Sequence, residues 1–188
     1  MQIKVKVVGI EQAQARLAAQ QKKIDPVLTG ALITTATKSR TERYVKPLAK
    51  TIAPKRTRAA MKIKRARRWM MNSRVIPSGA SVPVIDYKTW GYDVIDATRA
   101  RIWVRGPNGR KTAAGFVNPS SKHKLPLQTR SSKTVGAKTY EYKRLLQIAG
   151  GLSVAYWFRD LTTAQTIRWV NAYLQGEFNK RMIKELNK

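Results

Sequence analysis

Hydrophobic and polar positions follow two different periods near the start of the chain. In Ile3–Val7 the apolar residues alternate with lysines, which is the period-two pattern of a half-buried strand. After Gly9, the segment Ile10–Gln21 is rich in Ala, Gln and Leu, residues that favour a helix. The pattern therefore predicts a strand, a glycine break and a helix over residues 3–21.

Proline residues mark the boundaries that we expect for the next helices. Asp25 followed by Pro26 is a helix start signal, because the aspartate caps the first turn and the proline ring already has a helical φ angle. This helix should run towards Lys46 and end or kink at Pro47. Farther on, Lys55–Arg68 is predicted to form a basic helix with a narrow apolar stripe. The stripe consists of Ala59, Ala60, Ile63 and Ala66.

Short strands separated by Pro, Gly and Ser turns are predicted for the middle of the chain. The expected strands are Ser73–Ile76, Val82–Ile85, Arg99–Arg105 and Ala114–Val117. Within the third, alternation places Ile102 and Val104 on one face and Trp103 with the flanking arginines on the other. Residues 106–112 and 118–139 have the composition of basic loops.

The final segment has the clearest helical spacing. Thr162 and Gln165 have the spacing of a capping box for a helix over Thr163–Leu186. Apolar residues then recur every three or four positions, at Ile167, Val170, Leu174, Phe178, Met182 and Leu186. Such a stripe implies burial against the sheet or against a neighbouring subunit. We expect Ile167–Leu174 to pack in the core of the chain, whereas the last three members are candidates for a subunit contact as much as for a core contact.

These elements predict an α+β fold. We expect a small antiparallel β-sheet packed with N-terminal helices and a C-terminal amphipathic helix, with basic loops between the elements. A chain of 188 residues with 43% hydrophobic residues is long enough for one core, so we expect a single domain over 1–188. This domain would include a basic helical region at about 26–68 and an extended basic loop at about 118–139.

The charge balance indicates a binding protein for a negatively charged partner. The chain has 38 Lys and Arg against 10 Asp and Glu, which gives a net charge of +28. A protein with this charge repels itself and attracts polyanions without a shaped pocket. Nucleic acid and an acidic protein surface are the candidate partners. No membrane partner is expected, because no apolar run approaches the ~18–20 residues that span a bilayer, and the start of the chain lacks a secretory signal.

Two long stretches contain many cations and no acid, one between Glu42 and Asp86 and one between Asp96 and Glu141. A run of charge is usually a solvated face, but two unbalanced runs favour binding to an acidic partner or to a DNA backbone. The candidate contact residues are Lys55, Arg56, Arg58, Lys62, Lys64, Arg65, Arg67, Arg68, Arg99, Arg101, Arg105, Arg110, Lys111, Lys122, Lys124 and Arg130.

Catalytic chemistry has little support in the sequence. There is no cysteine, and the one histidine, His123, lies between lysines in an expected surface loop. Asp86, Asp93 and Asp96 are close in sequence but lack the His or Glu partners of a metal site, so we expect them to be exposed or paired with nearby arginines. The chain contains no Walker loop, nucleophile elbow or HExxH helix. We therefore predict a protein that is not an enzyme and that has no cofactor or metal.

Named nucleic-acid modules are also missing from the sequence, which has no RNP1 segment, GXXG clamp or zinc finger. Five aromatic residues lie among the cations, namely Trp69, Tyr87, Trp90, Tyr92 and Trp103. Stacking on bases is one role for them, but packing in a core or on a sheet is the commoner one. If DNA is bound, we expect the contacts to be mainly to phosphates and independent of sequence.

The order of these elements resembles the phage minor tail protein Z group, within the wider tail-completion (neck) family. The resemblance covers most of the chain. It begins with a strand, a glycine and a helix, followed by a long Ala/Thr helix and a basic helix. A Pro-bounded strand and a strand ending in Gly-Phe-Val come next. A basic loop with a strand ending in Arg and a closing amphipathic helix complete the order. Its parts outside the two middle helices are Ile3–Gln21, Val82–Ile85, Gly115–Val117, Lys124–Arg130 and Thr163–Leu186. Tyr87–Thr98 and Tyr140–Phe158 have no counterpart in it.

This resemblance implies a structural virion protein without an active site. Such proteins form homo-oligomeric rings, commonly of six subunits, at the neck of the phage, where they join the tail terminator to the head connector. The resemblance thus places the chain in the virion, and in the host cytoplasm during assembly. The alternative that the residues leave open is a basic nucleic-acid-binding protein of ribosomal type. An amphipathic helix at the end of the chain, in place of a long basic tail, favours the first interpretation.

Overall fold

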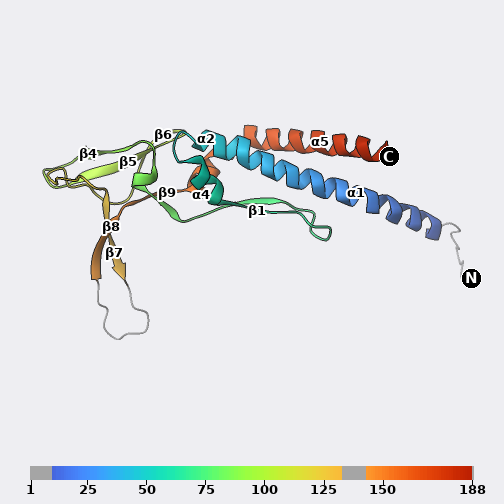
Figure 1. Cartoon of the computed structure of the whole chain (residues 1–188), viewed down its shortest axis with the longest axis horizontal. Coiled ribbons are helices and arrows are strands. Elements are labelled where there is room, and N and C mark those ends of the chain that lie inside the picture. The colour runs from blue at the N-terminus through green and yellow to red at the C-terminus, as the bar shows by residue number, and fades with distance from the viewer. Residues whose placement is uncertain (1–9, 133–142, 188) are drawn as a thin grey trace, which may run out of the picture. The chain divides into compact units, whose positions relative to one another are not determined.

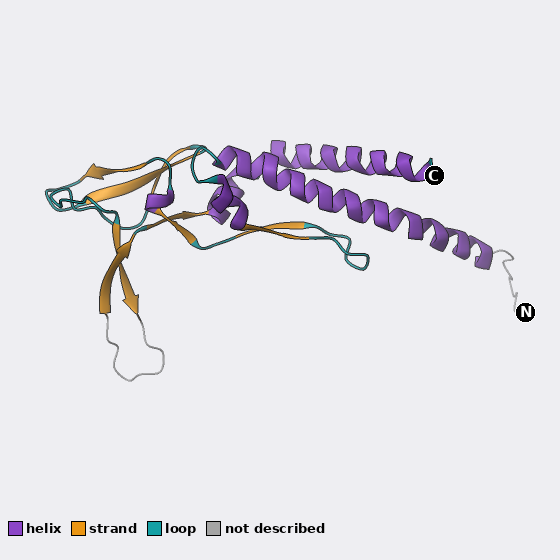
Figure 2. Cartoon of the chain, viewed as in Figure 1, coloured by secondary structure: helices purple, strands orange, loops and turns teal. Residues whose placement is uncertain are grey.

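The computed structural model describes residues 10–132 and 143–187. It confirms an α+β fold that combines helices with small antiparallel sheets and ends in a helix (Figure 1; Figure 2). Contacts between residues divide the chain into two compact units. Unit 1 consists of the described parts of Met1–Ser39, Ile63–Val75 and Ile167–Lys188, and unit 2 of the described parts of Arg40–Lys62 and Ile76–Thr166.

One long helix, α1 (Ile10–Ser39), forms the first described segment and runs through Pro26. The predicted helix start at Asp25 and Pro26 is therefore wrong. A proline inside a helix removes one backbone N–H and costs about 3 kcal/mol. The segment before it is rich in Ala, Gln and Leu, which favour a helix, and α1 continues across the proline. The strand predicted at Ile3–Val7 lies outside the described residues.

The helix changes its winding shortly before it ends. α1 passes into a π-helix, η1 (Arg40–Val45), and then into the short helix α2 (Lys46–Leu48). Pro47 has no N–H to donate to the carbonyl four residues earlier, so one bond of the helical ladder is missing, and α2 ends one residue after the proline. The predicted end of the helix at Pro47 is confirmed to within one residue.

A β-hairpin is present where a basic helix was predicted over Lys55–Arg68. Only α3 (Pro54–Ala59) is helical there, and the chain continues as β1 (Met61–Lys64), which pairs with β2 (Arg74–Pro77). Burial alternates along β1, starting from a fully buried Met61. The alanines of the predicted stripe fit a helix. The conformation is decided by pairing of β1 with β2, and the spacing of residues in the sequence does not show this pairing. The prediction of a helix beyond residue 59 is therefore wrong.

The described part of unit 2 contains three small antiparallel sheets. The first pairs β3 (Ser81–Pro83) with β9 (Gly150–Ser153). The second has the order β4 (Trp90–Val94), β5 (Ala100–Gly106) and β6 (Gly109–Thr112). The third pairs β7 (Leu127–Ser132) with β8 (Lys143–Ile148). A short 3-10 helix, η2 (Val84–Asp86), follows β3.

Three of the four predicted strands are present. They are Ser73–Ile76 as β2, Arg99–Arg105 as β5 and the first half of Val82–Ile85 as β3. The second half of that prediction is wrong, because Val84 and Ile85 belong to η2. The fourth, Ala114–Val117, makes only two isolated bridges. Part of the predicted loop 106–112 forms β6 instead. Pro107 and Gly109 suit the tight turn between β5 and β6, because Gly109 has a φ of +100°, which glycine adopts without strain.

Two helices close the chain, α4 (Val154–Leu161) and α5 (Ala164–Leu186). The Thr163 hydroxyl accepts the N–H of Thr166 at 3.3 Å, so Thr163 is the capping residue of α5. The predicted cap, Thr162, instead donates its hydroxyl to a carbonyl of α4 at 2.6 Å. The predicted helix is thus confirmed, its N-cap is Thr163, and the predicted capping box of Thr162 and Gln165 is wrong.

The apolar stripe of α5 is less buried than predicted. Ile167 is 51% exposed and Leu186 is 77% exposed, while the residues between them are half-buried. The prediction that Ile167–Leu174 packs in the core is therefore wrong. Each step of four residues advances about 40° beyond a full turn, so the stripe winds by about 100° along the helix and no straight neighbour covers all of it. In unit 1, α5 runs beside α1 in the opposite direction, and Arg181 donates a hydrogen bond to Thr34 at 2.8 Å (Figure 1).

The core of unit 2 includes a fully buried tryptophan, Trp157, on α4. Its Nε1 donates to the Tyr87 hydroxyl at 3.0 Å, and this hydroxyl donates to the Leu152 carbonyl at 2.5 Å. Ile102 and Val104 of β5 are also fully buried. The predicted alternation of β5 is therefore confirmed, and it directs the arginines of this strand away from the core.

Candidate partner-binding surfaces

The turn of the β1–β2 hairpin gathers cations around an exposed tryptophan. We define the hairpin tip as Lys64, Arg65, Arg67, Arg68, Trp69 and Met70. The backbone N–H groups of Arg67 and Met70 donate to each other's carbonyls at 3.0 and 2.8 Å, which closes a tight bend around Arg68 and Trp69. The Trp69 side chain is 79% exposed. The bend therefore presents an indole to solvent.

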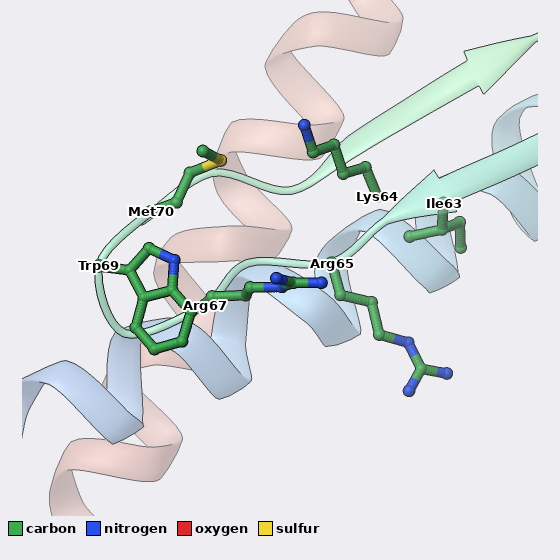
Figure 3. Close-up of a pocket in the computed structure, with 6 residues that line it drawn as sticks. All are labelled: Ile63, Lys64, Arg65, Arg67, Trp69 and Met70. Carbon is green, nitrogen blue, oxygen red and sulfur yellow. The ribbon is translucent and has the colours of Figure 1, made fainter.

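A hollow of about 570 Å³ lies beside the hairpin tip (Figure 3). Its walls are formed by Ile63, Lys64, Arg65, Arg67, Trp69 and Met70. They include three cations and no acid. Below the bend, the Ser73 hydroxyl accepts the N–H of Ala66 at 3.0 Å and fastens the two arms together. Tryptophan and arginine are the residues most enriched in the hot spots of protein interfaces, and they also stack on nucleic-acid bases.

A second basic surface covers one face of the β4–β5–β6 sheet. We define the arginine face as Arg101, Trp103, Arg105 and Arg110. Trp103 is directly opposite Gly91 in the register, and a Cβ at Gly91 would lie 2.5 Å from the indole. The glycine therefore lets the ring lie against the sheet. The Arg110 guanidinium lies 4.1 Å from the centre of the Trp103 ring, where a cation–π contact holds it in place.

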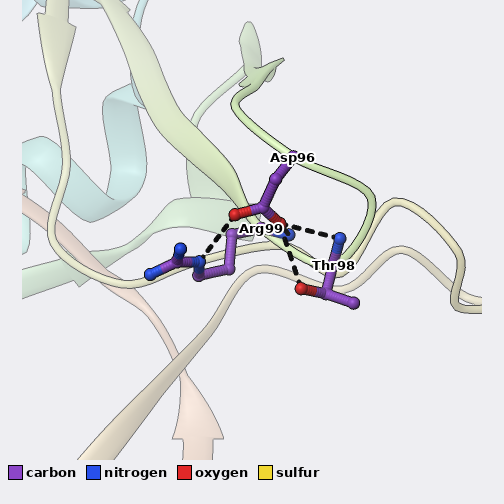
Figure 4. A network of polar contacts seen from close by, with 3 residues as sticks. All are labelled: Asp96, Thr98 and Arg99. Atoms are coloured by element: carbon purple, nitrogen blue, oxygen red, sulfur yellow. Dashed lines mark hydrogen bonds and ion pairs between the residues drawn. The ribbon is translucent and has the colours of Figure 1, made fainter.

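Two of the predicted contact arginines are already paired with aspartates. Asp96 accepts the N–H of Thr98 at 2.9 Å and the Arg99 Nε at 2.8 Å (Figure 4). The backbone bond from Thr98, followed by the Arg99 side chain, lowers the pKa of Asp96 from 3.8 to about 2. Arg56 pairs with Asp86 at 2.6 Å. The expectation that these aspartates pair with arginines is confirmed.

The other predicted contact residues belong to several separate elements. Lys55 and Arg58 lie on α3, Lys62 on β1, Lys111 on β6, and Lys122 and Lys124 in the loop before β7. All of these side chains are exposed except Lys111, which is half-buried. The backbone of Arg130 belongs to β7, but its side chain lies outside the described part of the structure. The hairpin tip belongs to unit 1, and the arginine face to unit 2.

A basic cleft in unit 2 was missed by the sequence analysis. It has a volume of about 530 Å³ and is lined by Lys46, Pro47, Lys50, Thr51, Thr89, Arg105, Gly106 and Pro107. Of these residues, only Arg105 was predicted to contact a partner. Lys46 and Lys50 flank Pro47 and are four residues apart, a spacing that places two side chains on the same face of a helical turn. Their proximity to a strand more than fifty residues away has no local signature.

An apolar groove lies between α1 and α5 in unit 1. Its volume is about 390 Å³, and its walls are Ile24, Leu28, Asn171, Leu174, Gln175 and Phe178. Of the three residues predicted as subunit contacts, Phe178 lines this groove and Met182 is half-buried, while Leu186 is exposed. The structure places all three on α5 and leaves their subunit contact a prediction.

Residues 10–132 and 143–187 contain neither a metal-binding cluster nor a membrane-spanning helix. No group of three or more His, Cys, Asp or Glu side chains in these ranges is arranged to hold a metal ion. None of the helices found there has the length and apolar character that a bilayer crossing requires. His123 is exposed, as predicted for a residue of a surface loop.

Comparison with known proteins gives no relative for this chain. No protein-family model, curated protein or solved structure matches it. Function must therefore be inferred from the charge, the exposed surfaces and the order of the elements.

Proposed function

We propose that this chain is a non-catalytic structural protein of a tailed phage, a tail-completion protein at the head–tail interface. In this role it joins the tail terminator to the head connector in the neck of the virion, as a ring of identical subunits with six as the expected number. The resemblance in element order supports the proposal through the long N-terminal helix, the strands and the closing helix. The basic helix of that resemblance is a hairpin in this chain, so its cations are presented at a turn.

The observation that carries the proposal is unbalanced positive charge on exposed elements. Even if each of the 10 carboxylates paired with one cation, the net charge of +28 would remain. Arg65, Arg67 and Arg68 of the hairpin tip are all exposed, as are Arg101 and Arg105 of the arginine face. Cations at this density raise the free energy of the isolated chain through repulsion, and an acidic partner relieves it.

A comparison of the charge of the ring with the charge of the DNA inside it favours acidic protein surfaces as the main partner. Six copies with a charge of +28 carry about +168. Duplex DNA has one negative charge per ~1.7 Å, so a ~50 Å stretch inside a ring holds about 30 charges. DNA passing through the ring would neutralise only a small part of the basic surface. The remaining cations require acidic faces on the neighbouring proteins.

Exposed apolar side chains support docking on proteins as well. Trp69, Val94 and Ile95 are 79%, 63% and 61% exposed. A phosphate backbone needs cations but no apolar surface, whereas the central part of a protein interface is apolar. The presence of both kinds of surface fits an assembly protein better than a simple nucleic-acid binder.

The mass of the purified full chain in moderate salt, after nuclease treatment, tests the proposal. Light scattering should show a defined ring, or a monomer that becomes a ring when phage tails lacking this protein are added. A monomer that stays monomeric with tails and binds RNA or DNA tightly would instead favour the ribosomal-type alternative.

A charge-reversal variant tests the docking surface itself. Arg65→Glu, Arg67→Glu and Arg68→Glu together should abolish binding to the acidic neighbours, measured by co-sedimentation with tails. The matched control reverses three exposed cations of α5, namely Arg168, Lys180 and Lys184, which lie away from its apolar stripe. Equal loss in both variants would contradict a specific role of the hairpin tip.

A further inference from the structure

The basic cleft of unit 2 has walls that come from three separate elements. Lys46 and Pro47 belong to α2, Lys50 and Thr51 to the turn that follows it, Thr89 to the approach to β4, and Arg105 and Gly106 to the end of β5, with Pro107 in the turn after it. Two backbone hydrogen bonds join these walls. The N–H of Lys88 donates to the Thr51 carbonyl at 2.9 Å, and the N–H of Arg105 donates to the Thr89 carbonyl at 3.0 Å. The walls of the cleft are therefore held together by backbone hydrogen bonds.

Three cations line this cleft, and no acid does. Lys46 pairs with Glu42 at 2.5 Å on the preceding helical turn. Near the other end, Asp160 accepts a hydrogen bond from the Asn108 side chain at 2.8 Å. Within the described residues, neither Lys50 nor Arg105 pairs with a carboxylate. The cleft consequently keeps a net positive charge that the chain itself does not neutralise.

The position of Arg105 adds a second indication of an anion-binding site. Arg105 is directly opposite Arg110 in the antiparallel pairing of β5 and β6, so both lie on the same face of the sheet. Like charges in this arrangement repel each other. Arg110 is held over Trp103, which leaves the guanidinium of Arg105 as the group that extends to the cleft. An anion between Arg105 and the two lysines would remove this repulsion.

We infer that this cleft binds a phosphate group, and that the phosphate belongs to a nucleic-acid backbone. The arginine fork matches the geometry of phosphate oxygens, and the two lysines add point charges. The remaining walls are Pro, Gly and Thr residues and include no aromatic ring on which a base would stack. The cleft therefore recognises phosphate without reading sequence. This inference does not depend on the proposed role in the phage neck.

The test uses the nuclease-treated full chain and a short fluorescent DNA duplex of arbitrary sequence. Lys46→Gln, Lys50→Gln and Arg105→Gln together form the cleft variant. Arg168→Gln, Lys180→Gln and Lys184→Gln form the control, because they remove the same one arginine and two lysines from exposed positions of α5. Fluorescence anisotropy is measured over a series of salt concentrations for both variants and the unchanged protein.

The cleft variant should bind the duplex more weakly than the control, with a shallower dependence of affinity on salt. Loss of the one phosphate contact made in the cleft should lower the slope of log K against log salt by about 0.9. If the triple variant does not fold, Lys50→Gln alone, at an exposed side chain, should lower the slope in the same direction by a smaller amount. Equal affinities and slopes for the cleft variant and the control would overturn the inference.

Competition experiments identify the source of the phosphate. Inorganic pyrophosphate that displaces the duplex from the unchanged protein, but has no effect on the residual binding of the cleft variant, would show a site for small phosphates and would overturn the assignment to a nucleic-acid backbone. Failure of pyrophosphate to compete, together with the expected change of slope, would support the polymer backbone as the ligand. If the cleft variant loses binding to poly-glutamate and keeps its binding to the duplex, the cleft recognises acidic peptide and the phosphate inference is wrong.

Discussion

The Tyr87 hydroxyl connects two parts of the core of unit 2. It donates to the Leu152 carbonyl and accepts the indole N–H of Trp157. Burial raises the pKa of Tyr87 from 10.0 to about 12, and the Trp157 bond offsets a part of this rise. The folded state thus holds the phenol proton more tightly than the unfolded state does. The resulting stabilisation is complete below pH 10 and is lost as the pH rises through about 12.

Substituting Tyr87→Phe should produce two effects on the free energy of unfolding. At pH 7 the loss should be about 1–3 kcal/mol, because the Trp157 N–H is left buried without an acceptor. Between pH 10 and about 12 the variant should lose less stability than the unchanged protein, because the titrating group is gone. Urea denaturation at a series of pH values measures both effects.

The control for this experiment is Tyr173→Phe, which removes a phenol from α5 in unit 1. It should leave the stability of unit 2 and its alkaline pH dependence unchanged. If the free energy of unfolding falls equally with rising pH in the unchanged protein and in the Tyr87→Phe variant, other groups govern the alkaline transition.

At the level of helices and strands, Pro26 is the clearest weak point of α1. Its side chain is exposed, and its ring leaves the carbonyl of Lys22 without an intrahelical donor. Pro26→Ala restores that donor. We expect a more negative helical circular dichroism signal and a gain of about 1–3 kcal/mol, since the intrinsic difference of about 3 kcal/mol is offset in part by a more flexible unfolded chain.

Pro54 provides the comparison for this prediction. It occupies the first turn of α3, where a missing N–H costs nothing and the fixed φ angle is favourable. Pro54→Ala should therefore give no gain in thermal unfolding. A lower melting temperature for Pro26→Ala would mean that the proline supports a bend that the fold requires.

Sequence patterns correctly predicted elements whose conformation depends on neighbouring residues. They failed where a strand pairs with a segment far away in the sequence. The alternation around Trp103 identified β5 and its buried face correctly, because Ile102 and Val104 leave one arrangement only. The segment that forms β1 fits a helical stripe as well as an alternating strand. Its conformation is decided by β2, which lies beyond a loop with no turn signature, so local spacing gave the wrong element.

In the molecule as a whole, the excess of 28 positive charges should make stability depend on salt. Raising sodium chloride from about 0.01 M to about 0.15 M shortens the screening length from about 30 Å to about 8 Å. We expect the melting temperature of the full chain to rise over this range, as measured by differential scanning calorimetry. The variant that neutralises Arg168, Lys180 and Lys184 should show a smaller rise. A falling melting temperature would show that attractive ion pairs outweigh repulsion.

Composition favours an anionic partner, but it does not locate a site. The 38 basic residues imply an anionic partner wherever they lie in the fold. Only the structure shows that Lys46 and Lys50 share a cleft with Arg105, because the three meet through the connection of α2 to the β4–β5–β6 sheet. It also shows that Arg56 and Arg99 are occupied by aspartates of their own chain. A count of cations cannot separate these two groups.

The winding of the apolar stripe along α5 has a consequence for symmetry. The exposed Ile167 and Leu186 point in directions about 100° apart around the helix axis. A two-fold dimer pairs one patch with itself, whereas a cyclic assembly needs two different patches on every subunit. A single helix with apolar ends that face different ways supplies both patches. In the ring that we propose, the two ends of the stripe would contact neighbouring subunits in two different directions.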